Sequence, residues 1–285
     1  MLQFVRHYLL AIQFFTRIPI TGPLAAWVGF SPAMLHASAA HFPGVGLLVG
    51  FATASTLYGL LVHLPASPFT PLVAAALSTA VGVLITGAFH EDGLADVADG
   101  LGGTLNRERA LEIMKDSRIG AFGAIALVLV LLCKVALLAL LGSLHASVVC
   151  SALLLGHVLS RFWPLLIIRL LPHVGDVAGS KSKPLADQIS LAALGVALLW
   201  LAIALGLLVY AQPLFTDGPL QNAGAQLVQA LLVATLASAF AFMLLWRWFK
   251  LRLQGFTGDC LGTTQQVCEI AFYLGWALGC AGAGA

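Results

Sequence analysis

Charged side chains are scarce in this chain of 285 residues. Lys, Arg, Asp and Glu make up only 9% of the sequence, and hydrophobic residues make up 60%. A typical soluble domain carries about 25% charged residues, so this composition excludes a soluble fold and predicts a polytopic membrane protein. There is also no basic stripe or basic tail, which argues against a nucleic-acid partner. The lipid bilayer is therefore the first partner that we expect.

Two other features are missing. The five cysteines show no C-x-x-C spacing, so we interpret them as small apolar residues rather than metal ligands or disulfide partners. The N-terminal region carries no cleavable signal pattern, because Arg6 and His7 interrupt its apolar stretch and no small-residue cleavage site follows. We expect a single integral membrane domain over residues 1–285.

Long apolar runs define the expected architecture, an all-α bundle of about seven transmembrane helices. About 20 apolar residues cross a bilayer. A shorter apolar segment, 2–15, predicts an interfacial or re-entrant helix. The seven predicted spans are 43–64, 68–89, 119–142, 146–171, 189–212, 222–246 and 267–285.

The basic residues gather in alternate loops. The loops near 65–67, 143–145 and 213–221 contain no Lys or Arg. Cytoplasmic loops carry an excess of these residues, so we expect the N-terminus and the three long loops in the cytoplasm and the C-terminus outside. The basic residues on the expected cytoplasmic side are Arg6, Arg17, Arg107, Arg109, Lys115, Arg118, Arg169, Lys181, Lys183, Arg247, Lys250 and Arg252.

Seven of the twelve acidic residues lie between Glu91 and Asp116. Asp92, Asp96 and Asp99 have the spacing i, i+4, i+7, which places them within roughly 60° of one another on a helix. Like charges aligned this way repel, and a hard cation between them relieves the repulsion. We therefore predict that these aspartates are catalytic and hold a divalent metal ion. Glu91, about 100° away, is a further ligand or supports one.

Groups suited to phosphate follow the carboxylates. The segment Lys115-Asp116-Ser117-Arg118, before a Gly-rich helix start, predicts an anion cradle that includes all four residues. Glu108 and Glu112 fit a solvated helix face instead. This pairing of carboxylates and phosphate-binding groups suits phosphoryl transfer.

Three residues further along add to the picture. Arg161, beside a proline in a predicted span, is expected to line the site as a phosphate contact. Lys134 is interpreted as a snorkelling cation, or as a sign that the predicted span is misplaced. Asp259 lies in a Gly-rich segment, 252–262, which we interpret as a cytoplasmic loop that meets the acidic loop at a common pocket.

Several segments together resemble the cobalamin synthase family, the adenosylcobinamide-GDP ribazoletransferases. The segments are FHEDGLADVADGLGG at 89–103, RALEIMKDSRIGAFG at 109–123, FTRIP at 15–19 and GFTGDCLG at 255–262. The resemblance covers the whole chain, and Arg17 in the early segment joins the expected substrate-binding residues. The chain departs from the usual pattern at 263–266, where it reads Thr-Thr-Gln-Gln.

The resemblance implies a Mg2+-dependent enzyme of the bacterial inner membrane. It would join adenosylcobinamide-GDP to alpha-ribazole or its 5'-phosphate, and release GMP, late in cobalamin nucleotide-loop assembly. In this reading Mg2+ sits on the aspartates, Asp96 or Asp99 takes the hydroxyl proton, and Lys115, Arg118 and Arg161 hold phosphate oxygens. The sequence leaves oligomeric state open, and a homo-oligomer is one outcome.

Two alternatives use the same residues differently. A CDP-alcohol phosphotransferase also places aspartates on a metal, but its Asp-x2-Asp spacing differs from the Asp92-x3-Asp96 spacing of this chain. A cation-coupled transporter would place the carboxylates at midplane depth and show inverted repeats, which are not apparent here.

Overall fold

The computed structural model describes residues 2–175, 189–211 and 223–281. These ranges are almost wholly helical, and their only β feature is an isolated bridge between His173 and Phe256. The helices are α1 Leu2–Phe15, α2 Gly22–Val28, α3 Pro32–Ser38, η1 Ala39–His41, α4 Phe42–His63, α5 Thr70–Thr86, α6 Phe89–Gly103, α7 Arg107–Ile113, α8 Ala121–Leu144, α9 Ala146–Ser160, α10 Trp163–Leu170, α11 Leu191–Ala211, α12 Ala223–Arg252 and α13 Gly258–Ala281. The expected all-α membrane bundle is confirmed.

Each of the seven predicted spans corresponds to a helix, or to the α9–α10 pair. In the described residues, five helical stretches are long and apolar enough to cross a membrane by themselves: Pro32–His63, Ala121–Leu144, Ala146–Leu170, Leu191–Tyr210 and Gly224–Arg252. Helices α5 and α6 meet the same criterion only together, with a bend of 90° between them.

The seventh predicted span is the one whose start differs most. Helix α13 begins at Gly258 rather than near residue 267, so the segment 258–262 is helix and not loop. Its first half carries Asp259, Gln265 and Gln266, and these polar side chains disguise it in a hydropathy reading. Most of α13 is nevertheless buried, because it packs against α12, α6, α9 and α8.

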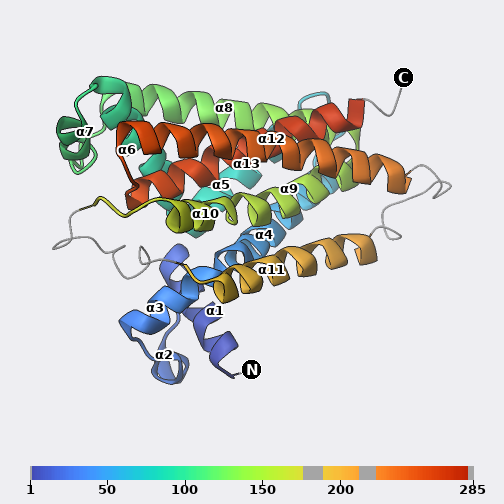
Figure 1. Ribbon diagram of the computed structural model, residues 1–285. Coiled ribbons are helices and arrows are strands. Elements are labelled where there is room, and N and C mark those ends of the chain that lie inside the picture. The colour runs from blue at the N-terminus through green and yellow to red at the C-terminus, as the bar shows by residue number, and fades with distance from the viewer. Residues whose placement is uncertain (1, 176–188, 212–222, 282–285) are drawn as a thin grey trace.

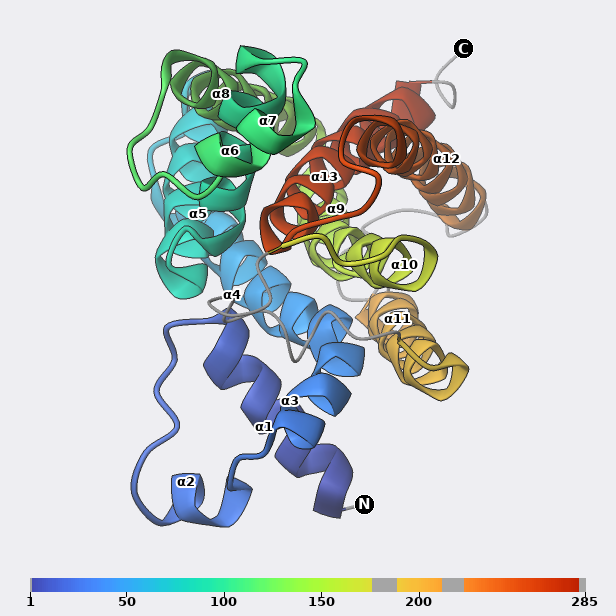
Figure 2. The ribbon, with the colours of Figure 1, turned by 60° about the vertical axis from the view of Figure 1, so that its left-hand side comes forward.

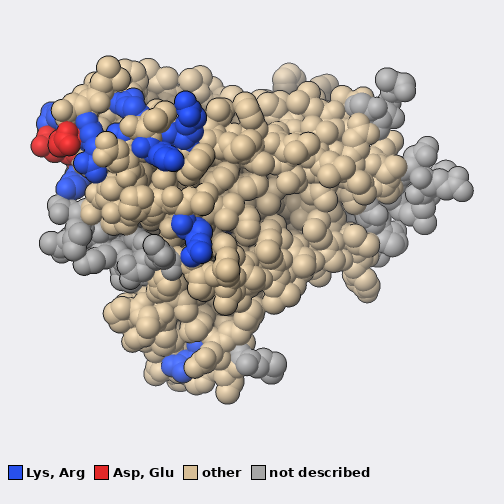
Figure 3. Space-filling view, in the orientation of Figure 1, with Lys and Arg blue, Asp and Glu red and all other residues tan. Residues whose placement is uncertain are grey.

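Most of the long helices run side by side, and α6 and α7 lie together at one end of the bundle (Figure 1). Helix α13 lies in the middle of the bundle, with its first turn directed toward α6 (Figure 2). Lys and Arg side chains gather at the end that carries α7 (Figure 3). The bundle therefore has a charged end, and α6 lies at it.

A sharp corner sends α6 out of line with α5. Gly87 and Ala88 both have positive φ, 68° and 58°, in the left-handed region that stops a helix. The side chain of Arg17 fills the space where a Cβ on Gly87 would lie. The Arg17 backbone N–H donates to the Ile85 carbonyl at 2.7 Å. The N-terminal segment thus braces the corner from which the acidic helix starts.

Helix α6 ends at Gly103, the last residue of the Gly-rich stretch Gly100-Leu101-Gly102-Gly103. Gly100 is there because Met114 and Ala110 pack directly against it, leaving no room for a Cβ. The following helix, α7, begins after Asn106, whose side chain accepts from the Arg109 N–H at 2.8 Å.

Candidate active site

The acidic face of α6 is graded in exposure. Asp92 is exposed, Asp96 is half-buried and Asp99 is buried, and all three lie on one side of the helix as the spacing predicts. Glu91 lies on a different side and is buried. Its carboxylate accepts from the Gln266 amide at 2.9 Å, so it faces α13.

Asp259 joins this face from the far end of the sequence. Gly93 packs so closely on the backbone of Asp259 that a Cβ at residue 93 would lie 2.9 Å from the Asp259 Cα. One turn further along α13, the Thr263 hydroxyl donates to the Gly93 carbonyl at 3.0 Å. The predicted meeting of the two segments is therefore confirmed. We call Asp92, Asp96 and Asp259 the acidic cluster.

Like charges make the acidic cluster hard to ionise completely. Burial, and then the charges of Asp259, Asp92 and Asp99, raise the pKa of Asp96 to about 7. Burial raises the pKa of Asp259 to about 6, with Asp92 adding to the effect and the hydrogen bond from Thr257 opposing it. Each negative charge disfavours the next, which is the electrostatic condition for cation binding.

The donor chemistry of the acidic cluster fits Mg2+. All of its donors are carboxylate oxygens, and Mg2+ is commonly held by one or two carboxylates together with substrate phosphates and water. Within the described ranges, no three His, Cys, Asp or Glu side chains are grouped as a metal-binding set. The fit therefore depends on oxygen chemistry and charge, and phosphate or water would supply the remaining ligands in place of a complete protein cage.

Asp99 has a different set of partners from its two neighbours on the helix. Its carboxylate accepts from the backbone N–H of Gly120 at 2.7 Å and of Gly123 at 2.8 Å. Both donors belong to the start of α8, where a carboxylate satisfies unpaired N–H groups and the helix dipole. Both oxygens of Asp99 thus link α6 to α8. This is a structural role, whereas the sequence predicted a metal-binding or catalytic role for Asp99.

The predicted anion cradle, residues 115–118, directly precedes the start of α8, to which Asp99 bonds. Lys115 and Ser117 are exposed, as is Arg118. The Arg118 guanidinium bonds to the Asp116 carboxylate at 2.6 Å. Hydrogen bonds from the side chain and backbone of Arg118 lower the pKa of Asp116 to about 2. In this conformation Arg118 is therefore paired with Asp116, although both remain accessible.

Two cations predicted from the spans lie in the interior of the bundle. Arg161 is 1% exposed and donates to the His157 carbonyl at 2.9 Å, so it offers no open surface to a substrate phosphate in this conformation. Lys134 does not snorkel. It is buried and pairs with Glu269 at 2.6 Å.

Glu269 is the residue that sequence reasoning overlooked. It lies in the middle of α13 and is 1% exposed. The available signal was a lone carboxylate and a lone Lys134 in two apolar helices, since buried charges need partners.

The last predicted residue, Arg17, is exposed at the α5–α6 corner, next to the start of the acidic helix.

Comparisons with known proteins show the family to which the chain belongs. The family model described as "Cobalamin-5-phosphate synthase" matches residues 7–277. A protein from Albidiferax ferrireducens named "Adenosylcobinamide-GDP ribazoletransferase" is 66% identical over 98% of this chain and 100% of its own length. Proteins of the same name are 60% identical in Polaromonas naphthalenivorans, over 98% of this chain and 99% of theirs, and 44% identical in Leptothrix cholodnii, over 96% of both. No solved structure matches. The match over nearly the whole length makes this chain a member of the cobalamin-5-phosphate synthase family.

Proposed function

We propose that the chain joins adenosylcobinamide-GDP to alpha-ribazole or its 5'-phosphate, releasing GMP and giving adenosylcobalamin or its 5'-phosphate. The name shared by relatives of up to 66% identity supports this reaction. The observation that carries it structurally is the acidic cluster, in which Asp259 meets Asp92 and Asp96 at the charged end of the bundle. The family match also argues against a CDP-alcohol phosphotransferase or a transporter.

The reaction displaces a nucleotide from a pyrophosphate. A ribazole hydroxyl oxygen forms a new bond to the phosphorus attached to cobinamide, and the bond from that phosphorus to GMP breaks. The hydroxyl proton needs an acceptor. We assign it to Asp96, because its raised pKa of about 7 suits a general base and the Asp99 oxygens already bond to α8.

Asp92 and Asp259 are then the residues that would hold Mg2+. The bound ion would neutralise charge on the pyrophosphate and on the departing GMP. Lys115 and Arg118, exposed near the end of α6, are proposed to bind phosphate oxygens, for which Arg118 would exchange Asp116 for substrate. Glu91 and Asp99 support the geometry, through Gln266 and through the start of α8.

We further propose a location in the bacterial inner membrane, with the acidic cluster on the cytoplasmic side. The gathering of Lys and Arg at the charged end supports this orientation (Figure 3). A phosphorylated substrate does not cross a bilayer unaided, so the acidic cluster has to face the compartment in which that substrate is made.

Purified protein in liposomes, supplied with adenosylcobinamide-GDP and alpha-ribazole, tests the reaction. Titration with Mg2+ should produce GMP and cobalamin in equal amounts. Asp92→Asn and Asp96→Asn should each lower kcat by about 100-fold or more, since charge neutralisation and proton transfer are each worth about that much. Exposed Glu108→Gln, which removes a carboxylate from neighbouring α7, is the matched control and should retain activity. Full activity of folded Asp92→Asn without a change in the Mg2+ requirement would overturn the metal assignment.

A further inference from the structure

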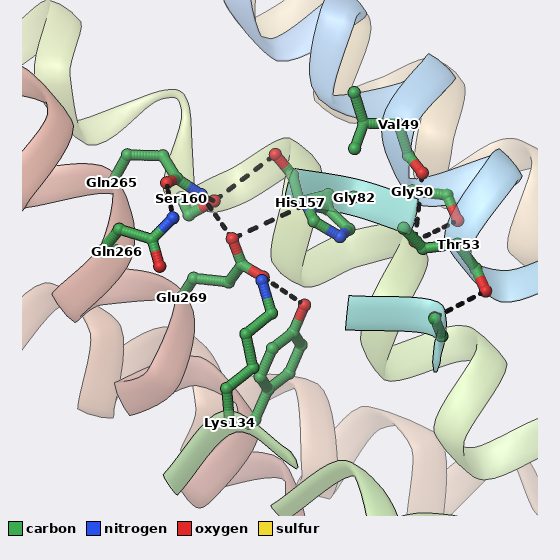
Figure 4. Close-up of polar contacts among 12 residues, drawn as sticks. Val49, Gly50, Thr53, Gly82, Lys134, His157, Ser160, Gln265, Gln266 and Glu269 are labelled. Carbon is green, nitrogen blue, oxygen red and sulfur yellow. Dashed lines mark hydrogen bonds and ion pairs between the residues drawn. The ribbon is translucent and has the colours of Figure 1, made fainter. Parts of the chain in front are cut away.

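A buried network of hydrogen-bonded polar side chains runs through the bundle from α8 to α6, the acidic helix. Its centre is Glu269, whose carboxylate pairs with Lys134 at 2.6 Å and accepts from the Tyr273 hydroxyl at 2.7 Å. Gln265 also donates to Glu269, and it donates to the Ser160 hydroxyl at 3.1 Å. Figure 4 shows Lys134 from α8, Ser160 from α9 and Gln265 from α13 converging on Glu269.

The buried network continues from Gln265 through Gln266 to α6. The Gln266 side-chain nitrogen donates to the side-chain amide oxygen of Gln265, Oε1, at 3.0 Å and to the Glu91 carboxylate at 2.9 Å. An amide nitrogen has two hydrogens, so both of those on Gln266 are used. The hydrogen bond to Glu91 therefore forms only in the Gln266 rotamer that also bonds to Gln265. The other residues of the buried network fix that rotamer.

Charge and burial make this link costly to break. Glu91 is 7% exposed, and its second oxygen has no hydrogen-bond partner among the described residues. The buried charges beside this link are the carboxylates Glu91 and Glu269 and the cations Lys134 and Arg161. Asp99 is also buried, but it bonds to the start of α8 instead. A buried carboxylate deprived of its hydrogen bond is strongly unfavourable, so α6 is driven to keep Glu91 against Gln266.

Glu91 and Asp92 are neighbours on α6, so anything that fixes the rotation of Glu91 fixes that of Asp92. One turn earlier on α13, Thr263 bonds to the Gly93 carbonyl, and Asp259 lies against Gly93. The same face of α13 thus holds α6 and supplies one member of the acidic cluster. A shift at Gln266 changes the spacing between Asp92 and Asp259.

We propose that Gln266 is a positioning residue, which, oriented by Gln265 and the Lys134–Glu269 pair, fixes the acidic helix through Glu91 and so sets the geometry of the acidic cluster. The inference rests on the proposed function, because it assigns the cluster to cation and pyrophosphate binding. It predicts that a fully buried amide away from the reacting atoms controls cation affinity.

Gln266→Met tests this, because Met has a similar length and shape but donates no hydrogen bond. Binding of Mn2+, measured by electron paramagnetic resonance on detergent-solubilised protein, should weaken about 10–100-fold, the usual cost of losing a group that orients a metal ligand. In turnover assays kcat should fall by a similar factor, while KM for alpha-ribazole stays near the wild-type value. Gln266→Asn, which keeps the amide but shortens its reach, should give a smaller loss and guards against misfolding of the Met variant.

Tyr273→Phe is the matched control. It removes one buried hydrogen bond to the same Glu269 but leaves the Gln265, Gln266 and Glu91 contacts in place. It should lower the unfolding temperature in detergent without changing Mn2+ affinity. Equal loss of Mn2+ affinity in Tyr273→Phe and the Gln266 variants would mean general destabilisation and would overturn the proposal.

Different results would exclude the positioning role alone and the proposed function as a whole. If wild-type protein binds Mn2+ and turns over while folded Gln266→Met or Gln266→Asn does both equally well, the positioning role is wrong and the proposed function stands. If wild-type protein neither binds Mn2+ through Asp92, as judged against Asp92→Asn, nor turns over, the proposed function fails and the positioning role fails with it.

Discussion

Asp96 concentrates the electrostatics of the site in one side chain. It is half-buried, and Asp259, Asp92 and Asp99 all add negative charge around it. Its neighbour Asp99 has the same residue type and the same helical face, but bonds to two backbone N–H groups at the start of α8. Environment rather than residue type therefore separates a group poised to exchange a proton from one that joins two helices.

The raised pKa of Asp96 has a direct consequence for pH dependence. The carboxylate is protonated below about pH 7 and then neither accepts a proton nor attracts a cation. We expect kcat to fall as the pH is lowered through about 7, and higher Mg2+ to move this acid limb to lower pH, because protons and cations compete. Steady-state assays from pH 5.5 to 8.5 at two Mg2+ concentrations measure both effects. An acid limb that does not move with Mg2+ would contradict the competition.

At the scale of elements, the site depends on how closely α6 approaches α13. Gly93 allows the approach, since a Cβ there would lie 2.9 Å from both the Asp259 Cα and its carbonyl oxygen. Backbone atoms cannot move aside as the end of a flexible side chain can. Two backbone carbonyls of α6 also contact α13. The Gly93 carbonyl accepts from the Thr263 hydroxyl, and the His90 carbonyl lies against Gly262.

Gly93→Ala should therefore push the two helices apart. We expect a destabilisation of about 1–3 kcal/mol, typical of overpacking, and a loss of turnover larger than this destabilisation explains, because the acidic cluster spans the contact. Gly103→Ala is the control on the same helix, since its Cβ would meet nothing nearer than the Ile113 Cδ1 at 3.9 Å. Thermal unfolding in detergent and turnover at saturating Mg2+ measure the pair. Wild-type behaviour of Gly93→Ala would show that the contact is not needed.

At the scale of the whole molecule, hydrophobic runs were sufficient to predict the bundle. The aspartate spacing also predicted which face of α6 is acidic. Polar residues within α13 hid its first turns, so Asp259 was expected on a loop instead of at a helix start. Lone charges in apolar helices indicated that Lys134 and Glu269 each need a partner, but no pattern within either helix specified which one, because the pair joins helices far apart in the sequence.

The arrangement of the bundle in the membrane gives the last prediction. The α4–α5 turn contains Ser67 and the α7 helix contains Glu108, both exposed. The positive-inside pattern places residue 108 in the cytoplasm and residue 67 outside. In intact inner-membrane spheroplasts, a membrane-impermeant maleimide should label Ser67→Cys and not Glu108→Cys, and inside-out vesicles should give the reverse. The unsubstituted protein, with exposed Cys133, sets the background in each preparation. The opposite pattern would put the acidic cluster on the side that lacks its phosphorylated substrates, and would refute the proposed orientation.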